Sequence, residues 1–201
     1  MFAFLMTLVL SADADAARAP IRCPRGTRIA LRKHEIGCRR WRSKIAHGPQ
    51  IKTHPRGAPW RLASDGHFAD GQLHGTWTEW FPNGQVRTTG TWDRGVRVGL
   101  WREWHPNGTL RWARAYDAQG RLHGAELRWY DNGDRSEIAE HIHGQRIGAW
   151  MRWRADGLLL LHEEFDHCGR LMNMPVDGHR HGMSADIHRV QPPPLGLGHC
   201  Q

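Results

Sequence analysis

A repeat of 24 to 25 residues is the feature that most constrains the fold of this chain. Gly75, Gly99, Gly124 and Gly148 are separated by 24, 25 and 24 residues. The same intervals recur in further columns: Trp80, Trp104, Trp129 and Trp153; Gly84, Gly108, Gly133 and Gly157; Trp92, Tyr116, His141 and Phe165; and Trp77, Trp101, Glu126 and Trp150. Self-similarity at a fixed period is typical of repeat architectures, in which each unit packs on its neighbours. The columns hold eight of the 11 Trp residues, so the abundance of Trp is a property of the repeat.

One unit, residues 75–92, has the sequence pattern of a β-hairpin. Two β-prone runs flank Pro82-Asn83-Gly84. Pro presets the first turn position, Asn tolerates the next, and Gly adopts positive φ, which together favour a tight turn. A second turn at Asp93-Arg94-Gly95 leads into the next unit. The sequence therefore predicts an all-β fold: tandem antiparallel β-hairpin repeats that form an elongated twisted meander.

Both faces of this predicted sheet carry aromatic side chains. Alternation within the first strand places Trp77 and Glu79 on one face and Thr78 and Trp80 on the other. A single flat sheet cannot bury both faces. Either the sheet twists and coils on itself, or one aromatic face is left for a partner. The candidate interaction face consists of Trp80, Trp104, Trp129 and Trp153.

The pattern fades toward both ends of the chain, as expected for terminal units that protect an open sheet. We expect a signal peptide at 1–17, a basic Cys-containing N-terminal cap at 18–46, a diverged repeat at 47–70, four full repeats at 71–169, and an irregular C-terminal cap and tail at 170–201.

The columns resemble the MORN repeat family, in particular its bacterial variant form, whose units run Gly-x-Trp-x-x-Trp/Tyr, Asn-Gly, aromatic, Gly. The match covers residues 71–166 closely and about 47–182 loosely. The resemblance implies a β-hairpin array that scaffolds proteins, with lipid association in some members and an antitoxin role for the bacterial variant. Glu126 in a Trp column and His141 in an aromatic column make the third unit the weakest match.

Positive charge is concentrated near the N-terminus. Residues 18–56 hold 12 Lys or Arg and one acid, Glu35, whereas residues 57–201 are close to neutral. Arg39, Arg40, Arg42 and Lys44 surround Trp41 and are the candidate contacts for an anionic surface. Such a patch attracts anionic lipid, other polyanions or an acidic protein by charge. Nucleic acid would also satisfy it, but we rank lipid or an envelope polymer first because we expect export. A solvated basic face is the structural alternative.

The expectation of export rests on the apolar run 1–10, which precedes the small-residue stretch 11–17. It also rests on four cysteines, an even number that suits an oxidising compartment. Three pairings are possible. We favour Cys23–Cys38 and Cys168–Cys200, because each would tie down a terminal segment that lacks the repeat pattern. The protein is then periplasmic or secreted. The alternative is a cytoplasmic protein with reduced thiols.

Chemical motifs are weak in this sequence. His74, His123 and His143 lie at or next to the turns of the repeat, and the tail residues His179, His181, His188 and His199 match no tight zinc spacing. His162 and His167 are five residues apart on a predicted strand, which is not a zincin pattern. We therefore assign no catalytic, cofactor or metal residues. The sequence predicts a non-enzymatic, exported binding or scaffolding module with a protein partner. Anionic lipid association through the basic segment and an antitoxin-like role are the alternatives.

Overall fold

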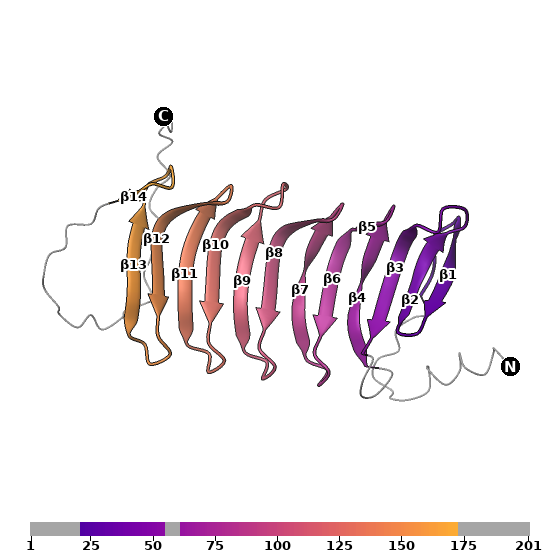
Figure 1. Ribbon diagram of the computed structural model, residues 1–201, viewed down its shortest axis with the longest axis horizontal. Helices are drawn as coiled ribbons and strands as arrows, with labels where there is room; N and C mark the ends of the chain where they lie inside the picture. Colours follow the sequence, from indigo (N-terminus) through magenta and orange to yellow (C-terminus); the bar gives the residue numbers. More distant parts are fainter. Residues whose placement is uncertain (1–20, 55–60, 173–201) are drawn as a thin grey trace, which may run out of the picture.

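The computed structural model describes residues 21–54 and 61–172, which form a single antiparallel sheet (Figure 1). Its strands are β1 (Thr27–Arg32), β2 (Glu35–Arg40), β3 (Ala46–Thr53), β4 (Leu62–Ala69), β5 (Gln72–Leu73), β6 (Gly75–Trp80), β7 (Val86–Asp93), β8 (Val96–Trp104), β9 (Leu110–Tyr116), β10 (Leu122–Trp129), β11 (Arg135–Ile142), β12 (Gln145–Trp153), β13 (Leu159–Phe165) and β14 (Leu171–Met172).

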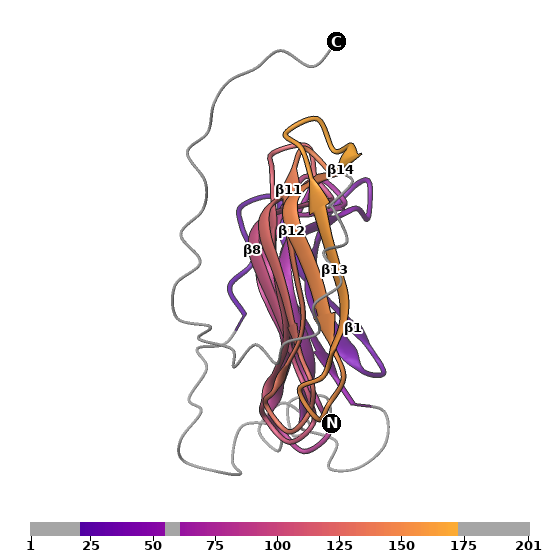
Figure 2. The ribbon, with the colours of Figure 1, turned by 90° about the vertical axis from the view of Figure 1, so that its left-hand side faces the viewer.

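The strands follow one another across the sheet in chain order, with only β5 off the path, paired to β4. The predicted all-β meander of hairpins is thus confirmed. Figure 2 looks along the row of strands and shows that the described residues make one narrow, twisted layer. Its side chains must therefore find their packing partners within the same face of the same sheet.

Hydrogen bonds connect successive Asn-Gly turns, which lie side by side at one end of the strands. Gly84 has a φ of 91° and donates its backbone N–H to the carbonyl oxygen of Phe81 at 2.9 Å. The Asn83 side chain donates to the carbonyl oxygen of Pro106 at 2.9 Å. Asn107 repeats this contact with Asp131 at 2.7 Å. Asn83 and Asn107 therefore join their turns to the next unit, whereas Asn132 donates to Asp134 within its own turn.

A row of residues crosses the sheet on one face, and we call it the spine; Gly or Ala alternates with Trp along it except at Arg114 and Glu126. Its members are Gly66, Trp77, Gly90, Trp101, Arg114, Glu126, Ala139 and Trp150. The strand registers pair Trp77 with Gly90, Trp101 with Arg114, and Glu126 with both Arg114 and Ala139. Directly opposed residues in antiparallel strands point to the same face, so these side chains share one side of the sheet.

The spine glycines provide the space into which the tryptophans pack. A Cβ atom at Gly90 would lie 2.1 Å from Cδ2 of Trp101, and one at Gly66 would lie 2.1 Å from Cε3 of Trp77. Trp101 is only 1% exposed. A single sheet layer thus buries an indole by laying it over the bare backbone of the neighbouring strand.

Aromatic and guanidinium groups complete this face. Trp92 meets Trp101 edge to face at a centroid distance of 5.0 Å, and Phe68 meets Trp77 in the same way at 6.5 Å. The guanidinium of Arg97 lies 4.6 Å from the Trp101 ring centroid. Stacked arginines take the place of the missing second layer, because their planar groups cover aromatic rings well.

The third unit replaces the Trp-on-Gly contact with an ion pair. Arg114 occupies the position that Gly90 holds in the preceding unit, and Glu126 occupies the Trp position. Glu126 is 5% exposed and accepts hydrogen bonds from Arg114 at 2.8 Å and from Arg128 at 2.9 Å. Burial opposes its ionisation, but the hydrogen bond from Arg128 and the charge of Arg114 outweigh it and lower the pKa of Glu126. The departure at Glu126 is thus accompanied by a second one at Arg114: the Gly–Trp pair of the preceding unit is replaced by an Arg–Glu pair.

His141 is the second departure in this unit, and it is buried beside the same ion pair. It is 4% exposed, and Nε2 lies 3.9 Å from Oε2 of Glu126. Its Nδ1 is buried without a hydrogen-bond partner. Burial, followed by the charges of Arg146 and Arg114, lowers the pKa of His141 against the pull of Glu126.

We predict that Gly90→Ala destabilises the protein strongly, because the new Cβ must displace the buried Trp101 ring. Overpacking of this kind costs about 1–3 kcal/mol. The matched control is Gly37→Ala, whose Cβ would have as its nearest neighbour the flexible Cγ of Gln50, at 3.3 Å. Urea unfolding of both variants measures the difference. Equal losses of unfolding free energy would show that the indole does not depend on the glycine.

We also predict that His141 makes the protein less stable in acid. Because the folded-state pKa is lowered from 6.5, the unfolded chain takes up a proton at higher pH than the folded chain. Stability is therefore fully present above about pH 6.5 and falls as the pH drops toward the folded-state pKa. His141→Tyr, which introduces the residue found at Tyr116 in the same column, removes this contribution. Urea titrations at pH 7.5 and pH 5 should show a smaller acid loss in the variant, and equal losses contradict the prediction.

Candidate functional site

The N-terminal end of the sheet forms a basic cap, defined here as residues 21–46. Cys23 and Cys38 are joined by a disulfide, with their Cα atoms 5.5 Å apart, so this part of the predicted pairing is confirmed. Cys38 is buried in β2. The bridge therefore anchors the segment before β1 onto the sheet. Cys200 lies outside the described residues, and its pairing with Cys168 stays a prediction.

A tight turn between β2 and β3 presents the aromatic and basic side chains of the cap. Lys44 has a φ of 58° and donates its N–H to the Arg40 carbonyl oxygen at 3.0 Å. Arg40 in turn donates to the Ile45 carbonyl oxygen at 2.9 Å. These bonds hold the turn closed, so the side chains of Trp41 and Arg42 extend away from the sheet.

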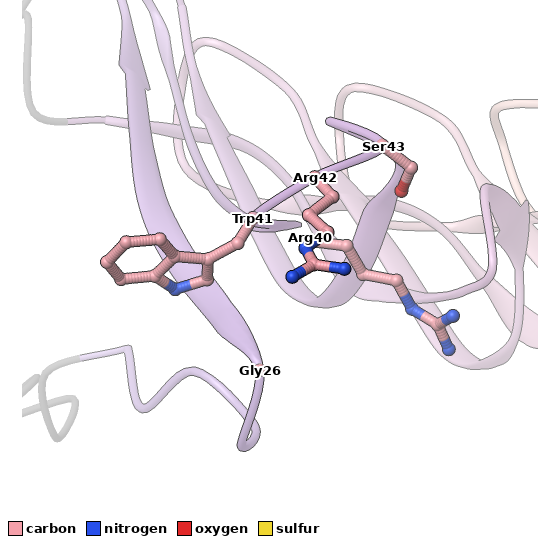
Figure 3. A pocket seen from close by; sticks show the side chains of 5 residues that line it. All are labelled: Gly26, Arg40, Trp41, Arg42 and Ser43. Atoms are coloured by element: carbon pink, nitrogen blue, oxygen red, sulfur yellow. The ribbon is translucent and has the colours of Figure 1, made fainter.

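The turn borders a shallow, open hollow (Figure 3), lined by Gly26, Arg40, Trp41, Arg42 and Ser43. Trp41 is 65% exposed, and its one stacking neighbour in the described residues is Arg28, whose Cζ lies 5.9 Å from the ring centroid. Leu31 is 70% exposed on the nearby β1 strand, and Ile29 and Ile45 are also exposed. The cap thus shows apolar and cationic groups side by side.

The structure divides the four predicted cationic contacts into two kinds. Arg39 is largely used internally, since it bonds to Glu35 at 3.3 Å and to the Lys44 carbonyl oxygen at 3.2 Å. Arg40 is half exposed and pairs with Asp70 at 2.5 Å. Arg42 and Lys44 are exposed and form no ion pair within the described part of the chain. These two cations are the ones available to an external anion.

The tryptophans of the candidate interaction face are half-buried and lie at bulges. The register shifts at Trp80, Trp104, Trp129 and Trp153 alike. Some of their carbonyl oxygens accept hydrogen bonds from the preceding unit: Trp129 accepts from His105 at 3.1 Å, and Trp153 from the Tyr130 hydroxyl at 2.7 Å. Bulges raise local twist. This column therefore has a structural role, and its role in contacting a partner stays a prediction.

The opposite edge of the sheet holds a cluster that the sequence reasoning missed. Asp117, His123 and His143 offer ligand atoms that all lie within 4.8 Å of one another. Hydrogen bonding with His143, followed by bonds from Arg121 and the backbone, lowers the pKa of Asp117 well below its usual range. Both His residues had been interpreted as turn residues, and Asp117 belongs to a different hairpin from His143. Only the fold brings them together.

The described residues include no helix long and apolar enough to cross a membrane. Among curated proteins, none matches the chain. A solved structure with some likeness is that of an S. aureus TarM mutant in complex with Fondaparinux, alpha-GlcNAc-glycerol and UDP; it is 6% identical, with a TM-score of 0.28, and the match covers 73% of this chain and 23% of that chain. A likeness at that level carries no argument about fold or function.

A family comparison gives a firmer result. The family described as MORN repeat variant matches residues 73–93 and 97–111. These two stretches run from β5 into β9 and contain the hairpin turn, the Trp columns and the spine contact of Trp101 with Gly90. MORN repeats are in general non-enzymatic modules that bind proteins or membranes. The sequence columns, the hairpin array and the family match agree, and the hairpin repeats of this chain are similar to the MORN repeat variant.

Proposed function

We propose that the protein is an exported, non-catalytic binding module whose basic cap attaches it to an anionic membrane surface. The observation that carries the proposal is Trp41, which is 65% exposed between Arg40 and Arg42 at the tip of a closed turn. Trp favours the membrane interface, because its ring is apolar and its N–H can reach water. Neighbouring cations add attraction to anionic headgroups.

The arrangement of the cap supports contact with a surface better than binding in a pocket. The hollow beside Trp41 is open, and its polar side chains are two arginines and one serine hydroxyl. Ile45 and, at the other end of the β1–β2 hairpin, Leu31 add exposed apolar side chains to the cap. Side chains of this kind make a shallow interfacial anchor. They provide neither an acid–base pair nor an activated nucleophile, which supports a non-enzymatic role.

Export is supported by the Cys23–Cys38 disulfide, because such bridges persist in oxidising compartments. The predicted signal peptide at 1–17 lies outside the described residues. An antitoxin-like role in the cytoplasm is disfavoured by the same bridge, since cytoplasmic thiols are kept reduced. Periplasmic or secreted localisation is therefore part of the proposal.

A protein partner is the second candidate, and one observation favours it. On the face away from the spine, the registers align Leu127, Ile138 and Met151 in a half-buried apolar row. By strand alternation Trp129 lies on this same face, two residues beyond Leu127. A protein that docks there would cover the apolar row and the half-buried tryptophans together, and the rigid sheet would act as its scaffold.

The test is flotation of the full chain with anionic and neutral vesicles at low and high salt. The double variant Arg42→Gln/Lys44→Gln should weaken binding to anionic vesicles, because each cation near the surface contributes about 1 kcal/mol. Trp41→Ala should lower the binding that survives high salt. The charge-matched control is Arg87→Gln/Arg94→Gln, which removes two exposed cations from the middle of the sheet.

The control should float like the unmodified protein, and binding should fall as salt screens the charges. An equal loss of vesicle binding in the control and in the cap variants would show that binding depends on net charge alone and would contradict the proposal. Binding that ignores lipid charge would contradict it as well. Co-purification of a protein lost on Trp129→Ala, with vesicle binding absent, would favour the second candidate.

A further inference from the structure

The side chains of Asp117, His123 and His143, which come from two hairpins, bring three metal-ligand groups together, and we call this cluster the Asp117 corner. Asp117 begins the turn after β9, His123 lies in β10, and His143 lies in the turn between β11 and β12. Oδ2 of Asp117 is 3.0 Å from Nδ1 of His143. The two imidazole rings lie 4.9 Å apart, centroid to centroid.

The preceding units have a simpler pair of side chains at the corresponding turns. His47 pairs with Asp70 at 3.1 Å, and His74 pairs with Asp93 at 3.2 Å, so each of these corners combines one imidazole with one carboxylate. In the repeat columns His123 corresponds to His47, and His143 corresponds to Asp70. An imidazole therefore replaces the carboxylate partner, and Asp117 adds a carboxylate from the preceding turn. Within residues 21–54 and 61–172, no other group of His, Cys, Asp or Glu has a metal-ligand arrangement of this kind.

The three groups are held in place before any ligand arrives. Oδ1 of Asp117 accepts the backbone N–H groups of Gln119 at 3.0 Å and Arg121 at 2.9 Å, which leaves Oδ2 directed at His143. His143 has a φ of 50°, and the next residue, Gly144, donates to the Leu122 carbonyl oxygen at 2.7 Å. Backbone hydrogen bonds thus fix both the carboxylate and the turn that carries the imidazole.

The corner already holds a cation, the guanidinium of Arg121. Its Nε donates to Oδ2 of Asp117 and its Nη2 lies against Nδ1 of His143, each at 2.8 Å. A guanidinium only donates and a carboxylate only accepts, so Nδ1 of His143 can bond to Arg121 or to Asp117 but not to both at once. The Arg121 side chain is half exposed, so solvent lies beside it into which it can move when a metal ion takes its place. The lone pairs that it bridges are those a metal ion would take.

We propose that Asp117, His123 and His143 form a binding site for a divalent transition metal ion, which displaces the guanidinium of Arg121. Two imidazole nitrogens and one carboxylate oxygen are a ligand set that suits Zn²⁺, Cu²⁺ or Ni²⁺, whereas Ca²⁺ and Mg²⁺ prefer oxygen alone. The two His residues are exposed, so water completes the coordination and the ion exchanges with solvent. The site lies at the sheet edge opposite the Asn-Gly turns and is independent of the basic cap.

The experiment is a calorimetric titration of the full chain with zinc sulfate. His143→Asn and His123→Gln each remove one ligand, and Asn tolerates the positive φ of residue 143. The matched control is His74→Asn, which alters a corner with a single imidazole. Thermal unfolding of each variant without metal checks that the fold is intact. Because other His side chains of the full chain add a background of weak zinc binding, the readout is the difference between variants.

We expect zinc affinity to fall at least about tenfold, or 1.4 kcal/mol, in His123→Gln and His143→Asn and to stay unchanged in His74→Asn. Arg121→Gln should tighten binding, because it removes the competing cation. Paramagnetic Cu²⁺ should broaden the ring-proton NMR signals of His123 and His143 first. Equal zinc affinity in all three His variants, or broadening that spares these two rings, would overturn the proposal.

Discussion

The packing of an indole over a backbone glycine on the adjacent strand is the interaction on which the rest of this structure depends. A sheet of one layer has no opposing sheet or helix to cover its side chains. Trp101 is nevertheless almost fully buried, because Gly90 lets its ring approach the neighbouring strand and Trp92 closes one side. The repeat period places such a contact in successive units, so each unit completes the burial of the next.

This packing between neighbouring strands occupies one face of the sheet and leaves the rest of the surface open to other molecules. The spine face is filled by aromatic rings, stacked arginines and the Arg114–Glu126 ion pair. Binding is therefore left to the ends, the corners and the other face. The exposed Trp41, the Asp117 corner and the apolar row around Ile138 lie outside the spine, and each takes its character from residues that depart from the repeat or do not belong to it.

The sequence predicted the architecture because hairpin turns and column spacing are local or periodic signals. Asn83-Gly84 and its copies determine the turns, and the period determines which residues align. The spine glycines were missed because Gly66 and Gly90 are not followed by glycines at the same column in later units, where Arg114 and Ala139 stand instead. The link between Arg114 and Glu126 depends on strand register, which spacing alone does not reveal.

The candidate sites were predictable to different degrees for the same reason. The basic cap was visible as a run of cations around Trp41, but only the structure separates the internally bonded Arg39 from the exposed Arg42. The corner at Asp117 was not predictable, because its residues are spread over 27 positions and its two His residues each match the turn region of the repeat. Contacts between successive hairpins are nonlocal, so they require the fold.

The most direct test of the account is a double-mutant cycle at the exchanged pair. Arg114→Gly leaves Glu126 with fewer partners, and Glu126→Trp forces an indole against the Arg114 side chain, so each should destabilise the protein by roughly 3 kcal/mol. The double variant restores the contact seen between Gly90 and Trp101. Urea unfolding should show it to be more stable than either single variant. Losses that simply add would contradict the claim that a large residue over a small one, or its charged substitute, holds neighbouring units together.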